Sequence, residues 1–275
     1  MIELKNADKF KFQAEPHIHS MLINGQWQTV PGVTSVSALY QLDFWKFAWP
    51  VKLMEEKILE EIKVAAFDRE THGGFLGGKD VQLEDVERIT KKAKNAWREK
   101  RDKSADAGTL AHGAIEEWIK YEMTKGQKRK DGTYLWWHTV SSLDSEQDNI
   151  LQNFQTWVKR TNPLFFASEL QVGSLTHSYC GILDAICEIN GKKVLLDFKT
   201  SATGDKPEYA IQLAGLAMAL EEMGYKVDER AILWLPKKGN YKYIPITSDL
   251  EWDKKAFLAG LKFLSYKNQV LGGEK

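Results

Sequence analysis

The stretch that decides the fold begins at Gly181-Ile-Leu-Asp184, turns at Asn190-Gly191 and ends at Leu196-Asp197-Phe198-Lys199-Thr200. Two strand-like apolar runs flank the Asn-Gly pair. This pair favours a two-residue type I′ turn, because both central residues of such a turn take positive φ. The sequence therefore predicts a β-hairpin that carries three charged side chains into an apolar run.

The turn fixes the register of the hairpin. If Ile189 faces Lys192, counting away from the turn places Asp184 opposite Asp197. Opposed side chains have Cβ atoms about 4.5–5.5 Å apart, and Lys199 lies two residues further along the same face. Two carboxylates are thus expected side by side, where they repel each other. The pairs nearer the turn are expected to be Glu188 with Lys193, Cys187 with Val194, Ile186 with Leu195 and Ala185 with Leu196.

Two carboxylates in a largely apolar hairpin need a compensating cation or a proton. One interpretation is structural: Asp184 or Asp197 forms a salt bridge with Lys199, since buried charges are normally paired. The other is a divalent-metal site, because carboxylate oxygens are the hard ligands that Mg²⁺ and Mn²⁺ prefer. We favour the metal site.

The composition is that of an ordinary globular protein long enough to bury a sizeable core. No apolar run approaches the ~20 residues needed to span a bilayer, and the first six residues lack a hydrophobic signal core. We therefore expect a cytoplasmic protein with no signal peptide and no membrane partner. Cys180 and Cys187 are the only cysteines. On one extended segment they lie ~23 Å apart, so they cannot bridge each other, and two thiols exclude a four-cysteine zinc or iron–sulfur site.

Positive and negative side chains balance, with 38 of each, so the net charge does not indicate a nucleic-acid partner. Their distribution is more informative. Residues 88–103 include eight basic side chains against Glu99 and Asp102. A run of this kind is usually a solvated helix face, and a face that holds the phosphate backbone of DNA is the alternative.

The hydrophobic pattern changes from helical to strand-like near residue 165. Before that point we predict a hairpin over 17–30 and then helices over 51–64, 83–97, 110–121 and 146–160. After it we predict strands over 165–172, 178–189 and 193–199, a helix over 208–223, two strands flanking 237–240 and a helix over 250–268. This order predicts one α/β domain over 1–275, in which an N-terminal hairpin and helical region (1–103) pack on a core (104–275).

Five short motifs follow one another between residues 104 and 220. They are Gly108-Thr-Leu-Ala-His112-Gly-Ala-Ile-Glu116, the acidic Glu169, Gly181-x-x-Asp184, Asp197-Phe-Lys199-Thr200, and Gln212 within Tyr209-Ala-Ile-Gln212. In this order they resemble the PD-(D/E)XK nuclease superfamily, and within it the RecB-like branch that includes phage and mitochondrial genome maintenance exonucleases. The chain departs from the branch at Leu216, where a tyrosine is frequent, and it lacks the four cysteines that hold an iron–sulfur cluster in some members.

The resemblance implies a restriction-endonuclease-like α/β fold, with a mixed central sheet flanked by helices and a helical N-terminal half. It also implies a metal-dependent deoxyribonuclease of a bacterium or phage, more an exonuclease than an endonuclease, that acts in DNA recombination, repair or replication. The chemistry of the residues agrees, because two Mg²⁺ or Mn²⁺ ions about 3.5–4 Å apart can activate water and neutralise charge at phosphorus. No iron–sulfur cluster is expected.

The resemblance also implies the metal ligands, which are His112, Glu116, Glu169, Asp184, Asp197 and the carbonyl of Phe198. Without that context, His112 on a helix is more often a packed or surface residue. Glu116 lies one helical turn after His112, and the alternative to a ligand role is a hydrogen bond to His112. Glu169 in an apolar strand is either a third acidic ligand or the partner of a basic side chain.

Two further residues are assigned to catalysis beside Asp184 and Asp197. Lys199 would position or deprotonate the attacking water, or neutralise the charge at phosphorus, and the sequence does not separate these roles. Gln212 would contact substrate or bound water, with a surface helix cap as the alternative.

DNA contacts are expected from two places in the N-terminal half. The basic run directly precedes the His112 motif, which favours backbone contacts by Lys94, Arg98, Arg101 and Lys103. Trp136 and Trp137 lie between polar flanks and are candidates for stacking on unpaired bases, although core packing is the commoner use of tryptophan.

Two rival functions remain. The segment 73–79 fits the first seven positions of a phosphate-binding G-x-x-x-x-G-K loop, but Asp80 replaces the Ser or Thr that the loop requires. The second rival is a nucleic-acid-binding module whose nuclease centre is inactive. An intact set of His112, Asp184, Asp197 and Lys199 argues against it.

Overall fold

The computed structural model describes residues 2–41, 51–61, 87–93, 111–124, 145–201 and 203–271. The chain divides into two compact units. One contains residues 1–40 together with 108–275, and the other contains residues 41–107. The first forty residues thus belong to the same unit as the core strands. The single domain expected over 1–275 stays a prediction.

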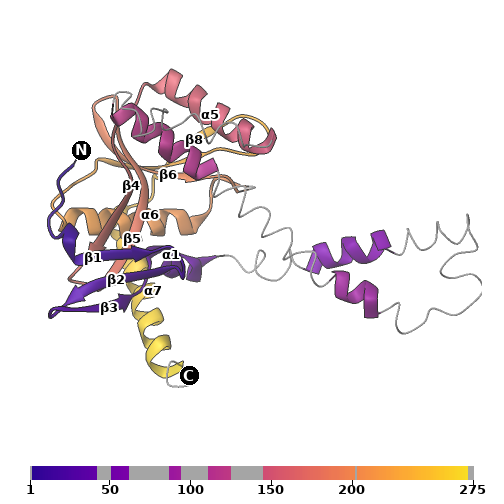
Figure 1. The fold of residues 1–275 in the computed structure, drawn as a ribbon, viewed down its shortest axis with the longest axis horizontal. Coiled ribbons are helices and arrows are strands. Elements are labelled where there is room, and N and C mark those ends of the chain that lie inside the picture. The colour runs from indigo at the N-terminus through magenta and orange to yellow at the C-terminus, as the bar shows by residue number, and fades with distance from the viewer. Residues whose placement is uncertain are drawn as a thin grey trace, which may run out of the picture. The chain divides into compact units, whose positions relative to one another are not determined.

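A five-stranded mixed sheet forms the centre of the larger unit (Figure 1). Its order is β4-β5-β6-β7-β8, with β6 and β7 parallel and the other neighbours antiparallel. The expected mixed α/β sheet is therefore confirmed. The strands are β4 (Leu164–Ser174), β5 (Tyr179–Ile189), β6 (Lys192–Lys199), β7 (Glu229–Trp234) and β8 (Lys242–Pro245).

The β5–β6 hairpin turns where the sequence predicts. Asn190 and Gly191 have φ values of 52° and 77°, as a type I′ turn requires. The register is confirmed from Ile189–Lys192 as far as Ala185–Leu196.

The ladder of this hairpin stops one pair before the two carboxylates. The expected pairing of Asp184 with Asp197 lies beyond the last pair of the ladder and stays a prediction. The backbone N–H of Phe198 donates a hydrogen bond to Oδ2 of Asp184 at 2.6 Å. The carboxylate of Asp184 accepts the N–H of β6 at the point where the backbone ladder ends.

Helices cover both faces of the sheet (Figure 1). On one face, α6 (Pro207–Glu222), α7 (Leu250–Leu271) and the short α1 (Val33–Ser37) enclose a core with Leu183, Ile186 and Leu195. On the other face, α5 (Ser145–Thr161) and the helix over 111–123 enclose a second core with Ala185 and Leu196. Apolar side chains on both sides of the central strands explain their nearly continuous hydrophobic sequence.

The N-terminal forty residues form a separate three-stranded antiparallel sheet. It contains β1 (Phe10–Gln13), β2 (Ile18–Ile23) and β3 (Gln26–Val30), and a short 3-10 helix, Ala38–Tyr40, follows α1. The predicted 17–30 hairpin is confirmed, whereas β1 was not predicted. The ring of Phe10 lies 2.4 Å from where a Cβ of Gly173 would stand, so β1 packs on β4 at a position that only glycine permits.

The smaller unit is described at residues 51–61 and 87–93, which are helical as predicted. Lys57 and Lys92 both form ion pairs with Glu61, and Leu53 and Ala93 are buried. The 73–79 loop of the rival phosphate-binding hypothesis lies outside the described residues. Within the described part of the chain, no helix combines the length and the apolar character needed to cross a membrane.

Candidate metal centre

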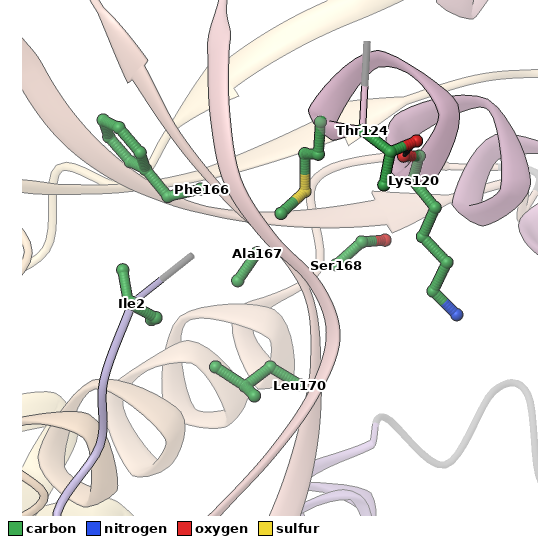
Figure 2. A pocket seen from close by; sticks show the side chains of 8 residues that line it. Ile2, Lys120, Thr124, Phe166, Ala167, Ser168 and Leu170 are labelled. Carbon is green, nitrogen blue, oxygen red and sulfur yellow. Dashed lines mark hydrogen bonds between the residues drawn. The ribbon is translucent and has the colours of Figure 1, made fainter. Parts of the chain in front are cut away.

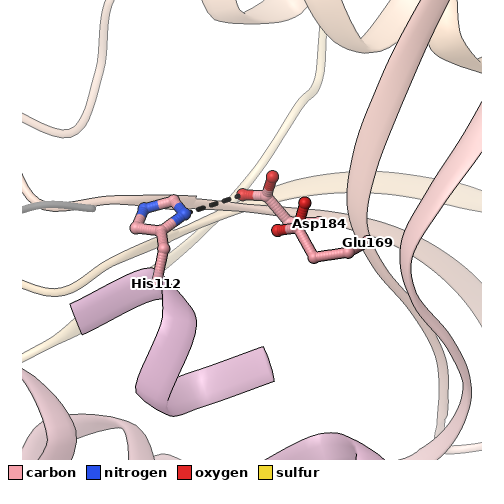
Figure 3. Close-up of side chains that lie close together, drawn as sticks. All are labelled: His112, Glu169 and Asp184. Carbon is pink, nitrogen blue, oxygen red and sulfur yellow. Dashed lines mark ion pairs between the residues drawn. The ribbon is translucent and has the colours of Figure 1, made fainter. Parts of the chain in front are cut away.

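Three potential metal ligands meet midway along the β4–β5 pair. His112 comes from the helix over 111–123, Glu169 from β4 and Asp184 from β5 (Figure 3). One ligand atom from each lies within 4.8 Å of the other two. Nδ1 of His112 is 3.9 Å from Oδ2 of Asp184. The structure thus brings together three of the residues assigned as ligands from the sequence, and we call them the metal cluster.

The register of β4 and β5 explains the meeting of the two carboxylates. Ser168 pairs with Ala185 and Leu170 pairs with Leu183, so Glu169 lies across from Asp184. On the β4 side, the acidic side chain opposite Asp184 is therefore Glu169. Two opposed carboxylates thus occur between β4 and β5.

The backbone of Glu169 is in the left-handed region, with φ of 46°. This conformation is unfavourable for a residue with a long side chain and costs on the order of 1–3 kcal/mol. It occurs inside β4, at the residue whose carboxylate joins the metal cluster. Such strain persists only where the surrounding structure imposes it, and functional sites are where it concentrates.

Electrostatics in the metal cluster favour a cation. Burial, together with the carboxylates of Asp184 and Glu116, raises the pKa of Glu169 to about 8, against a smaller lowering by Lys120. Near neutral pH this carboxyl therefore keeps its proton unless a positive charge replaces it. A divalent cation at the cluster would provide that charge.

A second group of polar side chains lies where β6 meets α6. Nζ of Lys199 is 2.7 Å from Oδ2 of Asp197. Gln212 joins both partners: its Nε2 donates to Oδ1 of Asp197 at 3.0 Å, and its Oε1 accepts from Nζ of Lys199 at 3.4 Å. We call these three residues the ion-pair network. The salt bridge weighed as the alternative to a metal site is therefore present, between Asp197 and Lys199.

The pKa values of Asp197 and Lys199 are both raised, but for different reasons. Burial raises the pKa of Asp197, and the ammonium of Lys199 opposes that rise. Burial alone would lower the pKa of Lys199, but the carboxylates of Asp197 and Asp184 outweigh it and raise this pKa. Lys199 is thus a protonated ammonium at neutral pH.

Phe198 links the metal cluster to the ion-pair network. Its N–H binds Asp184, while the residues on either side of it in the chain form the ion pair. Its ring is buried against Phe154, with centroids 5.7 Å apart, and 6.1 Å from the ring of His112. This packing fixes the β6 backbone between the two groups. The role of the Phe198 carbonyl as a ligand stays a prediction.

The remaining assigned residues are not brought into the metal cluster. Glu116 forms an ion pair with Lys120, one helical turn further on. The assigned DNA contacts, Lys94, Arg98, Arg101, Lys103, Trp136 and Trp137, lie outside the described residues.

Tyr209 is the residue that the sequence analysis missed. Its ring centroid lies 4.9 Å from Nζ of Lys199, and its hydroxyl is 3.0 Å from Oγ of Ser201. The available signal was its position three residues before Gln212, which places both on one face of α6. Tyr209 therefore supports the ammonium from the side of the helix.

An apolar pocket of about 250 Å³ adjoins the metal cluster along β4 (Figure 2). Ser168 and Leu170, which flank Glu169 in the chain, line it. The other lining residues are Ile2, Lys120, Met123, Thr124, Phe166 and Ala167. Hydrocarbon forms most of its wall, and Lys120, Thr124 and Ser168 are its polar lining residues.

No protein-family model and no curated protein matches the chain. Among solved structures, it is similar to a "putative exonuclease" from Eubacterium rectale, with 12% identity and a TM-score of 0.38 over 62% of this chain and 69% of that one. It is also similar to SSO0001, with 12% identity and a TM-score of 0.28 over 57% of this chain and 74% of that one. Both scores are too low to assign an activity.

Proposed function

We propose that this protein is a metal-dependent nuclease that hydrolyses DNA phosphodiester bonds at the metal cluster. One observation carries the proposal: His112, Glu169 and Asp184 present ligand atoms within 4.8 Å of one another, and the Asp197–Lys199 ion pair begins one residue from the amide that binds Asp184. A cation site and a fixed ammonium are thus adjacent, and phosphodiester hydrolysis uses both.

The donor set fits a divalent cation. Carboxylate oxygens suit Mg²⁺ and Mn²⁺, and the imidazole of His112 suits a transition metal such as Mn²⁺. The pKa of Glu169 is raised by burial and by the neighbouring carboxylates, and a bound cation would favour its ionised form. When bound, the ion would supply Lewis-acid activation of the phosphodiester and neutralise its charge. Of the other ligands that the resemblance implies, Asp197 is paired with Lys199 and Glu116 with Lys120, so we place the ion at the metal cluster; the Phe198 carbonyl stays a proposed ligand.

The ammonium of Lys199 would bind the scissile phosphate or orient the attacking water. Its raised pKa favours these electrostatic roles over proton abstraction, since a general base must be unprotonated. The carboxylate of Asp197 pairs with the ammonium of Lys199, and Gln212 and Tyr209 hold the Lys199 side chain in place.

DNA as substrate and exonucleolytic cleavage rest on the motifs that resemble RecB-like exonucleases. The same resemblance supports a role in recombination, repair or replication. No described residue distinguishes attack at an end from attack within a strand, so these finer assignments depend on the substrate experiment.

The test is cleavage of end-labelled single- and double-stranded DNA by the purified protein, with Mg²⁺, Mn²⁺ or EDTA. We expect cleavage with a divalent ion and none with EDTA. Asp184→Asn should lower the rate by about 1000-fold or more, because a lost metal ligand removes several kcal/mol of transition-state stabilisation.

Glu188→Gln is the matched control. It removes a carboxylate from the same strand, four residues from Asp184 and paired with Lys193 near the turn, and it should leave the rate unchanged. Binding of DNA without cleavage in every metal would instead favour the module with an inactive centre.

A further inference from the structure

The last helix, α7, leaves a row of apolar side chains exposed. Of the eight large apolar side chains that are exposed among the described residues, four lie on this helix. They are Trp252, Phe263, Tyr266 and Val270, with exposed fractions of 71%, 57%, 62% and 57%. Together with the exposed Ala259, they form what we call the α7 stripe.

The spacing of the α7 stripe is that of a helix-packing seam. Successive members are separated by seven, four, three and four residues, which corresponds to the a and d positions of a heptad repeat. The helix already buries a different face in the core through Phe257 and Leu261. A helix with one apolar face satisfied and a second exposed is typical of a site that binds another element.

Within the larger unit, the α7 stripe is left exposed by the elements that pack against this helix. Tyr40 and Val36 pack against α7 at Gly260, on the buried side. In Figure 1 the C-terminal end of α7 points away from the central sheet.

The flanks of the α7 stripe are basic. Lys255, Lys262 and Lys267 occupy the e and g positions beside the apolar row, and none of them forms an ion pair among the residues that the structure describes. The nearby acidic groups are already engaged, since Asp253 pairs with Arg230 and Glu251 pairs with Lys254. The seam therefore presents hydrocarbon edged by positive charge.

We infer that the α7 stripe is the docking site for an acidic amphipathic helix of a partner protein. The apolar seam would receive the a and d side chains of that helix, and its e and g carboxylates would meet the three lysines. This role is separate from the proposed hydrolysis, because none of the stripe residues belongs to the metal cluster or the ion-pair network.

A second copy of this chain fits the stripe poorly. In a parallel pair Lys262 would face Lys267 of the other copy, and in a symmetric antiparallel pair Lys262 would face itself. Like charges at these positions oppose association. Single-stranded DNA also fits less well, since Ala259 and Val270 offer no ring for a base to stack on.

The test measures binding of two labelled synthetic peptides to the full-length protein by fluorescence anisotropy. Both carry four heptads with leucine at a and d, and they differ only in having glutamate or lysine at every e and g position. We expect the glutamate peptide to bind at least tenfold more tightly, because only its charges complement the flanking lysines.

Variants locate the binding site. The double variant Phe263→Ser, Tyr266→Ser should weaken binding of the glutamate peptide at least tenfold, and Lys262→Glu, Lys267→Glu should reverse the preference between the peptides. Asn268→Ala, on an exposed position outside the stripe, is the control and should change neither. Circular dichroism and DNA cleavage of each variant establish that it is folded, since neither pair belongs to the catalytic groups.

Four results would overturn the inference. Two concern the peptides: equal binding of both, or binding of neither. The third is self-association of the chain, measured by sedimentation and abolished in the serine variant. The fourth is binding of a labelled single-stranded oligonucleotide that depends on the α7 stripe.

Discussion

The metal cluster and the ion-pair network lie on adjacent strands and contain similar residues, but only the ion-pair network includes an ammonium beside its carboxylate. Glu169 and Asp184 face each other with an imidazole as their third member. Asp197, although more deeply buried, has the ammonium of Lys199 at 2.7 Å and an amide hydrogen bond from Gln212. Among the residues that the structure describes, no ammonium or guanidinium forms an ion pair with the first group, whereas the carboxylate of the second group is paired with Lys199.

This difference distinguishes a carboxylate that can bind a metal ion from a carboxylate that positions an ammonium, when both groups contain aspartate. A bound cation adds little electrostatic stabilisation to a carboxylate that is already paired with an ammonium. It adds much more to two opposed carboxylates that have no such partner. We therefore assign ion binding to the cluster on β4 and β5, and positioning of the ammonium to the network on β6 and α6.

Lys199→Met should give the largest effect that separates the two groups. Removing the ammonium should lower the cleavage rate by about 100- to 1000-fold, the usual effect of losing one electrostatic contact to the transition state. Binding of Mn²⁺, followed by isothermal titration calorimetry, should change little because the cluster is intact. The exposed Lys226→Met serves as the control, and loss of metal binding in Lys199→Met would merge the two groups into one site.

Gln212→Ala should give an intermediate effect. It removes the hydrogen bonds that hold both Asp197 and Lys199, and residues that orient a catalytic group typically contribute about 10- to 100-fold. The measurement is the rate at saturating DNA, beside Gln152→Ala on the exposed face of α5. A rate equal to that of the unchanged protein would show that the network needs no support from α6.

Glu116→Gln should give a small effect. Glu116 pairs with Lys120 and lies outside the metal cluster, so we expect a loss of less than about tenfold, well below that of losing a ligand. Cleavage rates measured over a range of Mn²⁺ concentrations check this. A loss as large as that of Asp184→Asn would make Glu116 a ligand and extend the cluster along the helix.

The smallest expected effect is a dependence of the free energy of unfolding on pH, measured in the presence of EDTA. Glu169 has a folded-state pKa of about 8, above its ordinary value. Between pH 6.5 and 8 the folded chain holds this proton and the unfolded chain has released it, so the free energy of unfolding should fall as pH rises through this window. Urea unfolding of the unchanged protein and of Glu169→Gln measures this, and the variant should lack that part of the slope.

The window from pH 6.5 upwards avoids an opposing group. Burial lowers the pKa of His19 to about 4, so its contribution to stability is lost as pH falls below about 6.5. Identical slopes for Glu169→Gln and the unchanged protein above pH 6.5 would contradict the unbalanced charge that we assign to the metal cluster.

Local sequence patterns are enough to predict the β5–β6 hairpin and the positions of most other elements. Asn190 and Gly191 specify a turn through local backbone preference, and a turn fixes the register of the strands beside it. Periodicity likewise placed α5, α6 and α7 within a few residues of their observed bounds, because amphipathic patterns are local. The motif order also identified His112, Glu169 and Asp184 together.

Which carboxylates meet depends instead on contacts between strands and helices that are distant in the chain. The pairing of β4 with β5 sets Glu169 against Asp184, and the positive φ of Glu169 has no sequence signal, since residues with long side chains avoid that region. The packing of α6 on β6 brought Gln212 and Tyr209 to Lys199. These contacts join segments distant in the chain, and their energies depend on burial and charge that exist only after the layers have assembled.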